Sequence, residues 1–412
     1  MVKKLKIAIF HLGFFFSGGG ERLVIEEAKG LLQMGHQVEV YVPIIDAKRC
    51  FPDLLGHIKI KRLFINLPIK FPLRDFIAIC GSIFLIAFTA FRFRQFDIFI
   101  GANQPGPLLC YILAKLLHKP YLIYLAQPTR IIYPRQIDKE VGFGKGSFNL
   151  FYITAKIFHP IIKKLDKISI INAGKVLVNG SYIAQAIKKI YGVKTLVCPA
   201  GTRISRSNFT DSRFSGKIRI KKRYYPKPYI LLTNRHFPQK KFEFVIRSTP
   251  FILEKFPQVK IIITGAFTKY THNLIRLTEK LNLQEKIFFI NYLNEAELEL
   301  CYKNAAVYVY TAPEEDFGMG VIEAMGYGIP VVAWNSGGPA TTVIHRKTGF
   351  LIPPFDVTKF TSAIIRLLKN SDLNRIMGLA ARNHVLKNYL YRNHLDILNS
   401  ALQNTFKSYY AN

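Results

Sequence analysis

Residues 314–332 read EEDFGMGVIEAMGYGIPVV, and they follow an apolar segment, AVYVYT at 306–311. The apolar segment predicts a buried strand, and the residues from about Phe317 onward predict a helix. Glu315 would then lie in the loop and Glu323 two turns along the helix, so the two carboxylates can serve two sites on one ligand. The glycines between them leave backbone amides open at a helix N-terminus, where phosphate binds readily. This stretch predicts a strand–loop–helix unit that binds a phosphorylated ligand with hydroxyl groups.

The same alternation of strands and helices extends outward from this stretch. Before it, PYILLTN at 228–234 and KIIITGA at 260–266 indicate buried strands with a helical segment between them. The first 45 residues repeat the pattern, with LKIAIF at 5–10 and QVEVYV at 37–42 on either side of a helix. Such alternation predicts an α/β protein with mostly parallel sheets. Ligands of these sheets bind beyond the carboxyl ends of the strands, so a cleft between two such domains is the expected site.

Two domains are expected from the length of 412 residues, because single hydrophobic cores stop growing at roughly 250–300 residues. We place the first domain at 1–200 and the second at 229–389, with a basic linker at 201–228 that contains KIRIKKRYYPKP. The net charge is +32, and residues 1–200 alone carry 28 basic and 11 acidic residues. Partners should therefore be anionic: nucleic acid, an acidic membrane surface or phosphorylated small molecules.

The composition excludes several classes of protein. With 50% hydrophobic and 20% charged residues, the chain is not disordered, collagen-like or built on a disulfide framework. The five cysteines are scattered without a CxxC or Cys/His cluster, so a reducing compartment fits best and a zinc site is not indicated. His11, His36 and His236 have no partners at metal-ligand spacing, and we expect structural or solvated roles for them.

Two segments combine apolar residues with flanking cations. Residues 76–91 carry no charge over 16 positions, fewer than the about 20 that a spanning helix needs. This run fits either a buried core helix or an interfacial helix. Residues 148–167 mix Phe and Ile with four lysines, which suits an interfacial helix on anionic lipid and equally a solvated helix with one apolar side. The N-terminal lysines before the apolar run at 7–16 resemble a signal peptide, but His11 interrupts the run and no A-x-A site follows, so we expect a strand there.

Two further loops have a composition that suits phosphate. SGGGE at 17–21 precedes a helix, and its glycines let backbone amides approach a ligand, although a tight turn explains them equally well. NRHFPQKK at 234–241 follows a strand and places Arg235 and Lys240 five residues apart. An arginine fork and a lysine charge can together neutralise a diphosphate, whereas each cation alone is more often part of a solvated loop.

Taken in order, these motifs resemble glycosyltransferase family 4, the retaining enzymes with the GT-B fold. The run at 315–323, E-D-F-G-M-G-V-I-E, resembles the E-x7-E signature of the family, and TNRHFPQK at 233–240 resembles its donor-phosphate loop. SGGGE, followed by a helix and GHQVEVY, resembles its N-terminal glycine loop. NSGGP at 335–339 and TGFLI at 348–352 match later landmarks in the same order, so the resemblance covers nearly the whole chain.

The resemblance implies the fold and the chemistry. We expect an α/β protein of the GT-B type, in which two Rossmann-like domains face each other across a cleft. The last helix, about 390–412, would cross back onto the first domain. A nucleotide diphosphate sugar would bind mainly to the second domain, and neither a cofactor nor a protein-bound metal is expected. Transfer would retain the anomeric configuration.

The resemblance also implies a role for each site residue. Arg235 and Lys240 would hold the diphosphate and stabilise its departing charge, which makes them catalytic. Glu315 would hold sugar hydroxyls near the reacting carbon, and Glu323 would hold the ribose. The other donor-binding positions are expected in two glycine-containing loops: Gly18, Gly19, Phe317, Gly318 and Met319.

One loop departs from the family pattern. YLAQPTRIIY at 124–133 resembles a subgroup with H-x-P-x-R followed by an aromatic residue, mostly mannosyl and related transferases that build lipid-linked glycans or surface polysaccharides. Ala126 stands where many members have a histidine thought to touch the sugar or the leaving phosphate, and Gln127 is the nearest polar substitute. We expect Gln127 and Arg130 on the acceptor or sugar side of the site. Two further departures lie in other loops: Thr341 for a common Glu, and Lys241 for the usual Gly.

We therefore expect a cytoplasmic retaining hexosyltransferase, peripheral on the inner face of the plasma membrane. It would move a hexose, with mannose from GDP-mannose as the first choice, to a hydroxyl of a glycan or lipid-linked acceptor in polysaccharide or glycolipid synthesis. The basic first domain would dock on an anionic membrane surface. A degenerate GT-B protein that binds nucleotide sugar or glycan without turnover is the main alternative, suggested by Ala126 and Thr341. A nucleic-acid binder is suggested only by the charge and lacks a binding module, so nucleic acid is not an expected partner.

Overall fold

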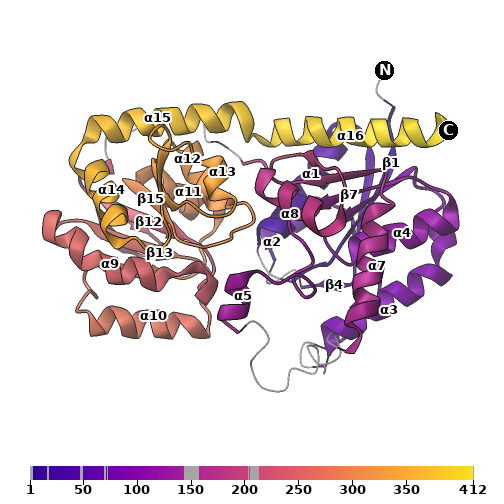
Figure 1. Cartoon of the computed structure of the whole chain (residues 1–412), viewed down its shortest axis with the longest axis horizontal. Coiled ribbons are helices and arrows are strands. Elements are labelled where there is room, and N and C mark those ends of the chain that lie inside the picture. The colour runs from indigo at the N-terminus through magenta and orange to yellow at the C-terminus, as the bar shows by residue number, and fades with distance from the viewer. Residues whose placement is uncertain are drawn as a thin grey trace. The chain divides into compact units, whose positions relative to one another are not determined.

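A computed structural model gives the structure of the chain, and it describes residues 3–15, 18–46, 50–68, 71, 73–142, 157–202, 204 and 213–411. The chain divides into two compact units. The first comprises Met1–Gly201 and Tyr391–Asn412, and the second comprises Thr202–Leu390. In each unit, helices cover a sheet whose strands run parallel, so each is a Rossmann-like α/β domain (Figure 1).

A seven-stranded parallel sheet forms the centre of the first unit, in the order β5-β3-β1-β6-β7-β8-β9. All side chains of β6 and β7 are buried, as expected for parallel strands covered on both faces. The first part of the apolar run that resembles a signal peptide lies in β1, an interior strand of this sheet. The strands are β1 (Lys6–His11), β3 (Gln37–Val42), β5 (Ile60–Arg62), β6 (Ile98–Ala102), β7 (Tyr121–Leu125), β8 (Lys175–Val178) and β9 (Leu196–Val197), with a small additional pair β2 (Gly13–Phe14) and β4 (Ile44–Ile45).

The helices of the first unit follow its strands along the chain (Figure 1). They are α1 (Gly19–Gln33), α2 (Pro52–Leu55), α3 (Arg74–Phe88), η1 (Ala90–Phe93), α4 (Gly106–Leu117), α5 (Gln136–Glu140), α7 (His159–Ile171), α8 (Ser181–Tyr191) and, from the end of the chain, α16 (Tyr391–Ala411).

The C-terminal helix α16 packs on the first unit, against α1 and β7. A buried ion pair joins the two helices: the His394 ring nitrogen Nε2 lies 3.1 Å from Oε1 of Glu27. The other ring nitrogen, Nδ1, lies 2.9 Å from the carbonyl oxygen of Pro199. These two acceptors suit a ring that carries hydrogen on both nitrogens, and the Cys198 sulfur lies 3.3 Å from Nδ1 as well. Burial alone would lower the pKa of His394, but its contacts with Cys198 and Glu27 raise that pKa to about 10.

A six-stranded parallel sheet forms the second unit, in the order β14-β13-β12-β15-β16-β17. Its strands are β12 (Tyr229–Thr233), β13 (Lys260–Thr264), β14 (Ile287–Ile290), β15 (Val307–Tyr310), β16 (Val331–Trp334) and β17 (Gly349–Ile352). Its helices are η3 (Pro238–Lys240), α9 (Phe242–Lys255), α10 (Lys269–Lys280), α11 (Glu295–Asn304), α12 (Met319–Gly326), α13 (Pro339–Thr342), α14 (Val357–Lys369) and α15 (Ser371–Asn388).

The segment expected to be a linker is in part regular structure. Residues 217–226 form an antiparallel hairpin of β10 (Lys217–Ile220) and β11 (Arg223–Pro226) within the second unit. Ile218 and Ile220 are buried, whereas Lys217 and Arg219 face solvent. The K-I-R-I alternation is the strand signal, and the high density of charge in this segment hid it.

Residues 76–91 do not form a buried core helix. Only three residues of α3 are buried, namely Ala78, Ser82 and Ile86, and the opposite side of the helix is exposed. Of the second apolar and basic segment, residues 148–156 lie outside the described residues, and residues 159–167 form the first part of α7. Among the helices that the structure describes, none is long and apolar enough to cross a membrane.

Candidate functional site

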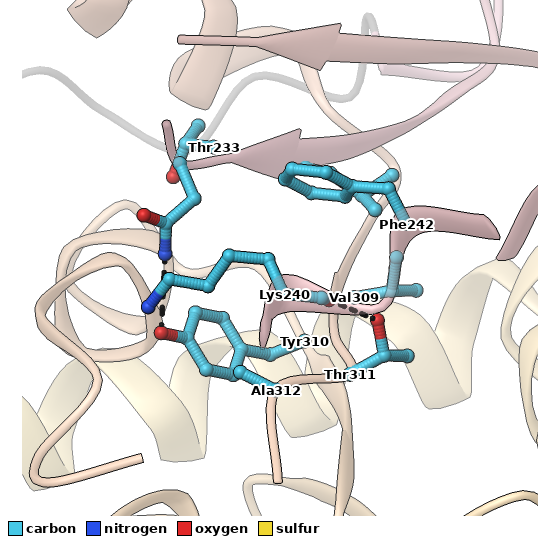
Figure 2. Close-up of a pocket in the computed structure, with 9 residues that line it drawn as sticks. Thr233, Lys240, Phe242, Val309, Tyr310, Thr311 and Ala312 are labelled. Atoms are coloured by element: carbon cyan, nitrogen blue, oxygen red, sulfur yellow. Dashed lines mark hydrogen bonds between the residues drawn. The ribbon is translucent and has the colours of Figure 1, made fainter. Parts of the chain in front are cut away.

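The predicted donor site lies at the carboxyl edge of the second sheet. The neighbouring strands β12 and β15 are parallel, so the loops that follow them, which carry Arg235, Lys240 and Glu315, emerge at the same edge. A hollow between these loops is shown in Figure 2, where the extended Lys240 side chain runs along it. The residues that line the hollow are Leu232, Thr233, Asn234, Lys240, Phe242, Val309, Tyr310, Thr311 and Ala312.

Lys240 and Glu315, two of the residues predicted to be catalytic, form an ion pair. The Lys240 ammonium lies 2.6 Å from Oε2 of Glu315, and the two side chains are 17% and 18% exposed. The Thr311 hydroxyl donates to the Lys240 carbonyl at 3.2 Å and thereby ties the end of β15 to the loop after β12. An ammonium has three donors, so Lys240 can keep this partner and still offer hydrogens to a phosphate.

The third predicted catalytic residue, Arg235, lies at the start of the same loop. Its guanidinium carbon lies 5.2 Å from the centre of the Phe237 ring, and its backbone amide donates to the Asn234 side chain at 3.0 Å. The next residue, His236, is fully buried and anchors the loop, because its Nδ1 lies 3.1 Å from the Thr271 hydroxyl. Burial lowers the pKa of His236 to about 4, so the ring is neutral and its role is structural.

Glycines let the loops at this edge approach one another closely. A Cβ atom on Gly265, after β13, would lie 1.8 Å from the Asn234 carbonyl oxygen, so only glycine fits behind the Arg235 loop. A Cβ on Gly338, in the NSGGP motif, would lie 2.4 Å from the Phe317 Cα, and the Gly338 amide donates to the Glu315 carbonyl at 2.6 Å. The NSGGP motif is therefore the platform on which the Glu315 loop rests. Sequence reasoning missed Gly265, although a glycine directly after a strand was a usable signal.

Glu323, the predicted ribose carboxylate, is oriented by hydroxyl groups. Its Oε2 accepts a hydrogen bond from the Tyr302 hydroxyl at 2.8 Å. That hydroxyl lies 2.8 Å from the Thr233 hydroxyl, which in turn lies 2.9 Å from the Tyr308 hydroxyl. The Tyr302 ring stacks on Tyr327 at 5.4 Å with an angle of 7°. Tyr302 and Tyr308 escaped sequence reasoning because they lie in an ordinary helix and strand with no motif around them.

The other predicted donor-binding residues of the second unit lie at the start of α12. Gly318 precedes the helix with φ +88°, a left-handed conformation that favours glycine, and Met319 is the first helical residue. Phe317 is buried, with its ring centre 6.1 Å from that of Tyr389, so its side chain packs in the core and only its backbone faces the loop. A helix N-terminus presents backbone amides of the kind that bind an anion.

The predicted residues of the first unit also lie at the carboxyl edge of its sheet. Gly18 is the N-cap of α1 and Gly19 its first residue, while Ser17 lies outside the described residues. A Cβ on Gly20 would lie 3.8 Å from the Asn103 amide, and the Asn103 side-chain oxygen accepts from the Ala126 backbone at 3.1 Å. The loops after β1, β6 and β7 are thus side by side.

The loop after β7 carries the last two predicted residues. Gln127 is exposed and Arg130 is half-buried. Asp166, on α7, holds this loop by accepting from the Thr129 hydroxyl at 2.6 Å and from Tyr191 at 2.7 Å. Sequence reasoning did not identify Asp166. The structure thus brings Lys240 and Glu315 into contact in the second unit, and gathers Gly18, Gly19, Gln127 and Arg130 at a separate edge in the first.

Within the described ranges, no three His, Cys, Asp or Glu residues are grouped so that they could hold a metal ion. His11 is buried, with Nδ1 3.0 Å from the Ala102 carbonyl oxygen, and burial lowers its pKa to about 4. His36 packs against α16, with Nε2 3.0 Å from the Asn399 side chain.

Two family models and several known proteins are similar to this chain. The model for glycosyl transferases group 1 matches residues 216–384, and that for glycosyltransferase family 4 matches residues 17–206. The alpha-1,3/1,6-mannosyltransferase ALG2 of Dictyostelium discoideum is 24% identical over 97% of this chain and 98% of its own. The GDP-mannose-dependent alpha-(1-6)-phosphatidylinositol monomannoside mannosyltransferase of Mycolicibacterium smegmatis is 29% identical over 43% of this chain and 48% of its own. Among solved structures, Anabaena HepE in complex with UDP and glucose has a TM-score of 0.73 at 19% identity, with 97% of this chain and 100% of that chain covered.

Proposed function

Because this chain belongs to the glycosyltransferases that these two family models describe, we propose that it transfers mannose from GDP-mannose to a hydroxyl of a glycan or lipid-linked acceptor. The chain is a hexosyltransferase, and its donor is a nucleotide sugar. The choice of mannose follows the mannosyltransferases among its relatives, and the choice of GDP follows the M. smegmatis relative, which is GDP-mannose-dependent.

The contact between Lys240 and Glu315 is the observation that carries this proposal. It joins a cation suited to a diphosphate with a carboxylate suited to sugar hydroxyls, at the edge of a sheet and near the N-terminus of α12. A diphosphate sugar needs these two kinds of group a few ångströms apart, since its phosphates and its hydroxyls lie on either side of the reacting carbon. We assign the diphosphate to Lys240, Arg235 and the backbone amides at Gly318 and Met319.

In the reaction, the bond between the anomeric carbon and the diphosphate oxygen breaks, and a bond from the acceptor oxygen forms. The acceptor proton leaves with the diphosphate, which takes up the negative charge that Lys240 and Arg235 stabilise. Glu315 would orient the sugar hydroxyls, and Glu323 would accept hydrogen bonds from the ribose. We propose retention of the anomeric configuration, by attack from the same face, and no role for a protein-bound metal.

The acceptor and the location complete the proposal. Gly18 and Gly19 would offer amides to the donor phosphates, and Gln127 and Arg130 would line the acceptor or sugar side. We place the enzyme in the cytoplasm, peripheral on the inner face of the plasma membrane, where a lipid-linked acceptor in polysaccharide or glycolipid synthesis would meet it.

A panel of nucleotide sugars tests the donor assignment. The melting temperature is measured with GDP-mannose, UDP-glucose and related donors, together with slow donor hydrolysis, for the wild type and for Lys240→Ala and Glu315→Ala. Lys303→Ala is the matched control, because Lys303 makes an ion pair of the same 2.6 Å length with Glu299 on the surface of α11. We expect stabilisation by GDP-mannose that is lost in the two site variants and kept in the control. Stabilisation by a UDP-sugar alone would overturn the choice of GDP-mannose, and binding without hydrolysis or transfer would favour a binding protein without turnover.

A further inference from the structure

The outer side of α3 carries a row of aromatic side chains in contact with solvent. Phe84 and Phe88 on α3 and Phe91 on the following short helix η1 are 65%, 67% and 60% exposed, and they are spaced four and three residues apart. The rings of Phe84 and Phe88 also touch, with centres 4.7 Å apart. A cluster of exposed aromatic rings is unusual on the surface of a water-soluble domain. Such a cluster marks a site that contacts another protein or a membrane.

Cations lie at both ends of this aromatic row. Arg92 and Arg94 follow it directly and are exposed. At the other end of α3, Arg62 and Arg74 both line a hollow, together with Ile65 and Asn66, and the hollow has no acidic residue in its lining. Within the described part of the chain, the Arg74 guanidinium has no hydrogen-bond or ion-pair partner. The helix thus has an apolar middle, with Arg62, Arg74 and the exposed Asp75 at one end and Arg92 and Arg94 at the other.

A second helix presents the same chemistry. On α7 and the residue before it, Phe158, Ile161 and Leu165 are exposed, and exposed lysines alternate with them at Lys163 and Lys164. The helix α4 packs against both α3 and α7, so the three helices form one layer of the first unit (Figure 1). On α4, Leu116 and Lys115 are exposed as well, so this helix shows the same pairing of apolar and basic side chains as α3 and α7.

We propose that the outer faces of α3, α4 and α7 form a docking surface for a bilayer that contains anionic phospholipid. The aromatic rings would enter the boundary between headgroups and acyl chains, and the arginines and lysines would meet lipid phosphates. A second copy of this chain is a poorer occupant, because a symmetric dimer through this face would bring cations against cations. This proposal rests on the proposed function in one respect only: a membrane-bound acceptor explains why the enzyme would need a docking surface.

Vesicle co-sedimentation of the full chain tests the proposal, with vesicles of phosphatidylcholine alone and of phosphatidylcholine mixed with phosphatidylglycerol. We expect binding to the anionic vesicles that weakens in high salt. The double variant Phe84→Ser/Phe88→Ser should bind at least about tenfold more weakly, because two rings no longer enter the bilayer. Arg92→Gln/Arg94→Gln should reduce binding to the anionic vesicles and lower its sensitivity to salt.

The matched control is Phe251→Ser/Ile376→Ser, which removes two exposed apolar side chains of the second unit and should leave vesicle binding unchanged. Melting temperatures of all variants show that they fold. Equal vesicle binding by the wild type and Phe84→Ser/Phe88→Ser would overturn the proposal. A dimeric wild type that becomes monomeric in this variant would overturn it as well, since a second copy of the chain would then occupy the surface. The stabilisation by nucleotide sugars is measured on the same samples, and the surface variants should keep it. If the wild type bound no nucleotide sugar, that result would count against the proposed function and not against the docking surface.

Discussion

The ammonium group of Lys240 lies 2.6 Å from the carboxylate of Glu315, although the two residues are 75 positions apart in the chain. The contact exists because β12 and β15 are neighbours in the sheet, so the loops that follow them meet at one edge. The cation that we assign to phosphate and the carboxylate that we assign to sugar hydroxyls are thereby held side by side. Preorganisation of this kind lowers the barrier to a reaction in which charge develops on the departing diphosphate.

Lys240→Met should abolish most of the activity at little cost in stability. A partly exposed ion pair contributes about 1 kcal/mol or less to folding, whereas loss of a charge that stabilises the departing group costs about 100-fold or more in kcat. Urea unfolding and steady-state rates of donor turnover measure the two quantities. If Lys240→Met kept a wild-type kcat, the electrostatic role of this residue would be wrong.

Tyr302→Phe should weaken donor binding more than it slows turnover. The variant removes the hydroxyl that donates to Glu323, so the carboxylate loses its orientation, and we expect KM for the donor to rise up to about tenfold. Tyr308→Phe is the comparison variant, because its hydroxyl hydrogen-bonds to Thr233, one step further along the same network. Calorimetric affinities for the nucleotide should differ between the two variants. Equal losses of nucleotide affinity in both variants would mean that the hydroxyl network of Tyr302, Thr233 and Tyr308 serves folding alone.

Gly338→Ala should disturb the Glu315 loop. The added Cβ would lie 2.4 Å from the Phe317 Cα, and backbone atoms cannot yield as the end of a side chain can. We expect a loss of about 1–3 kcal/mol of stability and a weaker donor-induced shift of the melting temperature. Gly56→Ala is the control, since a Cβ there would meet nothing within 4 Å. Similar melting curves for the two variants would contradict this account of the NSGGP motif.

The His394–Glu27 pair should make stability depend on pH. The folded-state pKa of His394 is raised to about 10 from an ordinary value of 6.5, so its stabilising contribution is fully present below about pH 6.5 and is lost as the pH rises towards 10. Wild type and His394→Gln should therefore differ most in free energy of unfolding near pH 6 and least near pH 10. A difference that grows with pH would mean that the buried ring is neutral.

Much of the fold followed from the sequence, because apolar runs and glycine loops repeat at regular intervals in both halves. The hairpin at 217–226 was missed since its charged residues masked a two-residue alternation. For residues 76–91 the sequence allowed either a buried core helix or an interfacial helix, because a run without charge does not reveal which side of a helix is covered.

The site was predictable only as separate loops. Arg235, Lys240, Glu315 and Glu323 stood out by their spacing, but their contacts depend on the strand order of the sheet, which places β15 beside β12 although two other strands come between them in the chain. Tyr302 serves Glu323 from a helix without any motif, so nothing in the linear order of residues could have connected the two.

The central claim is that this chain transfers a hexose from a nucleotide diphosphate sugar at the Lys240–Glu315 site. The most direct measurement is transfer from radiolabelled GDP-mannose to a lipid-linked glycan acceptor, with release of GDP followed in the same reaction. We predict labelled product and matching GDP release with the wild type and with Lys303→Ala, and neither with Lys240→Met or Glu315→Ala. Full product formation by the two site variants would contradict this account.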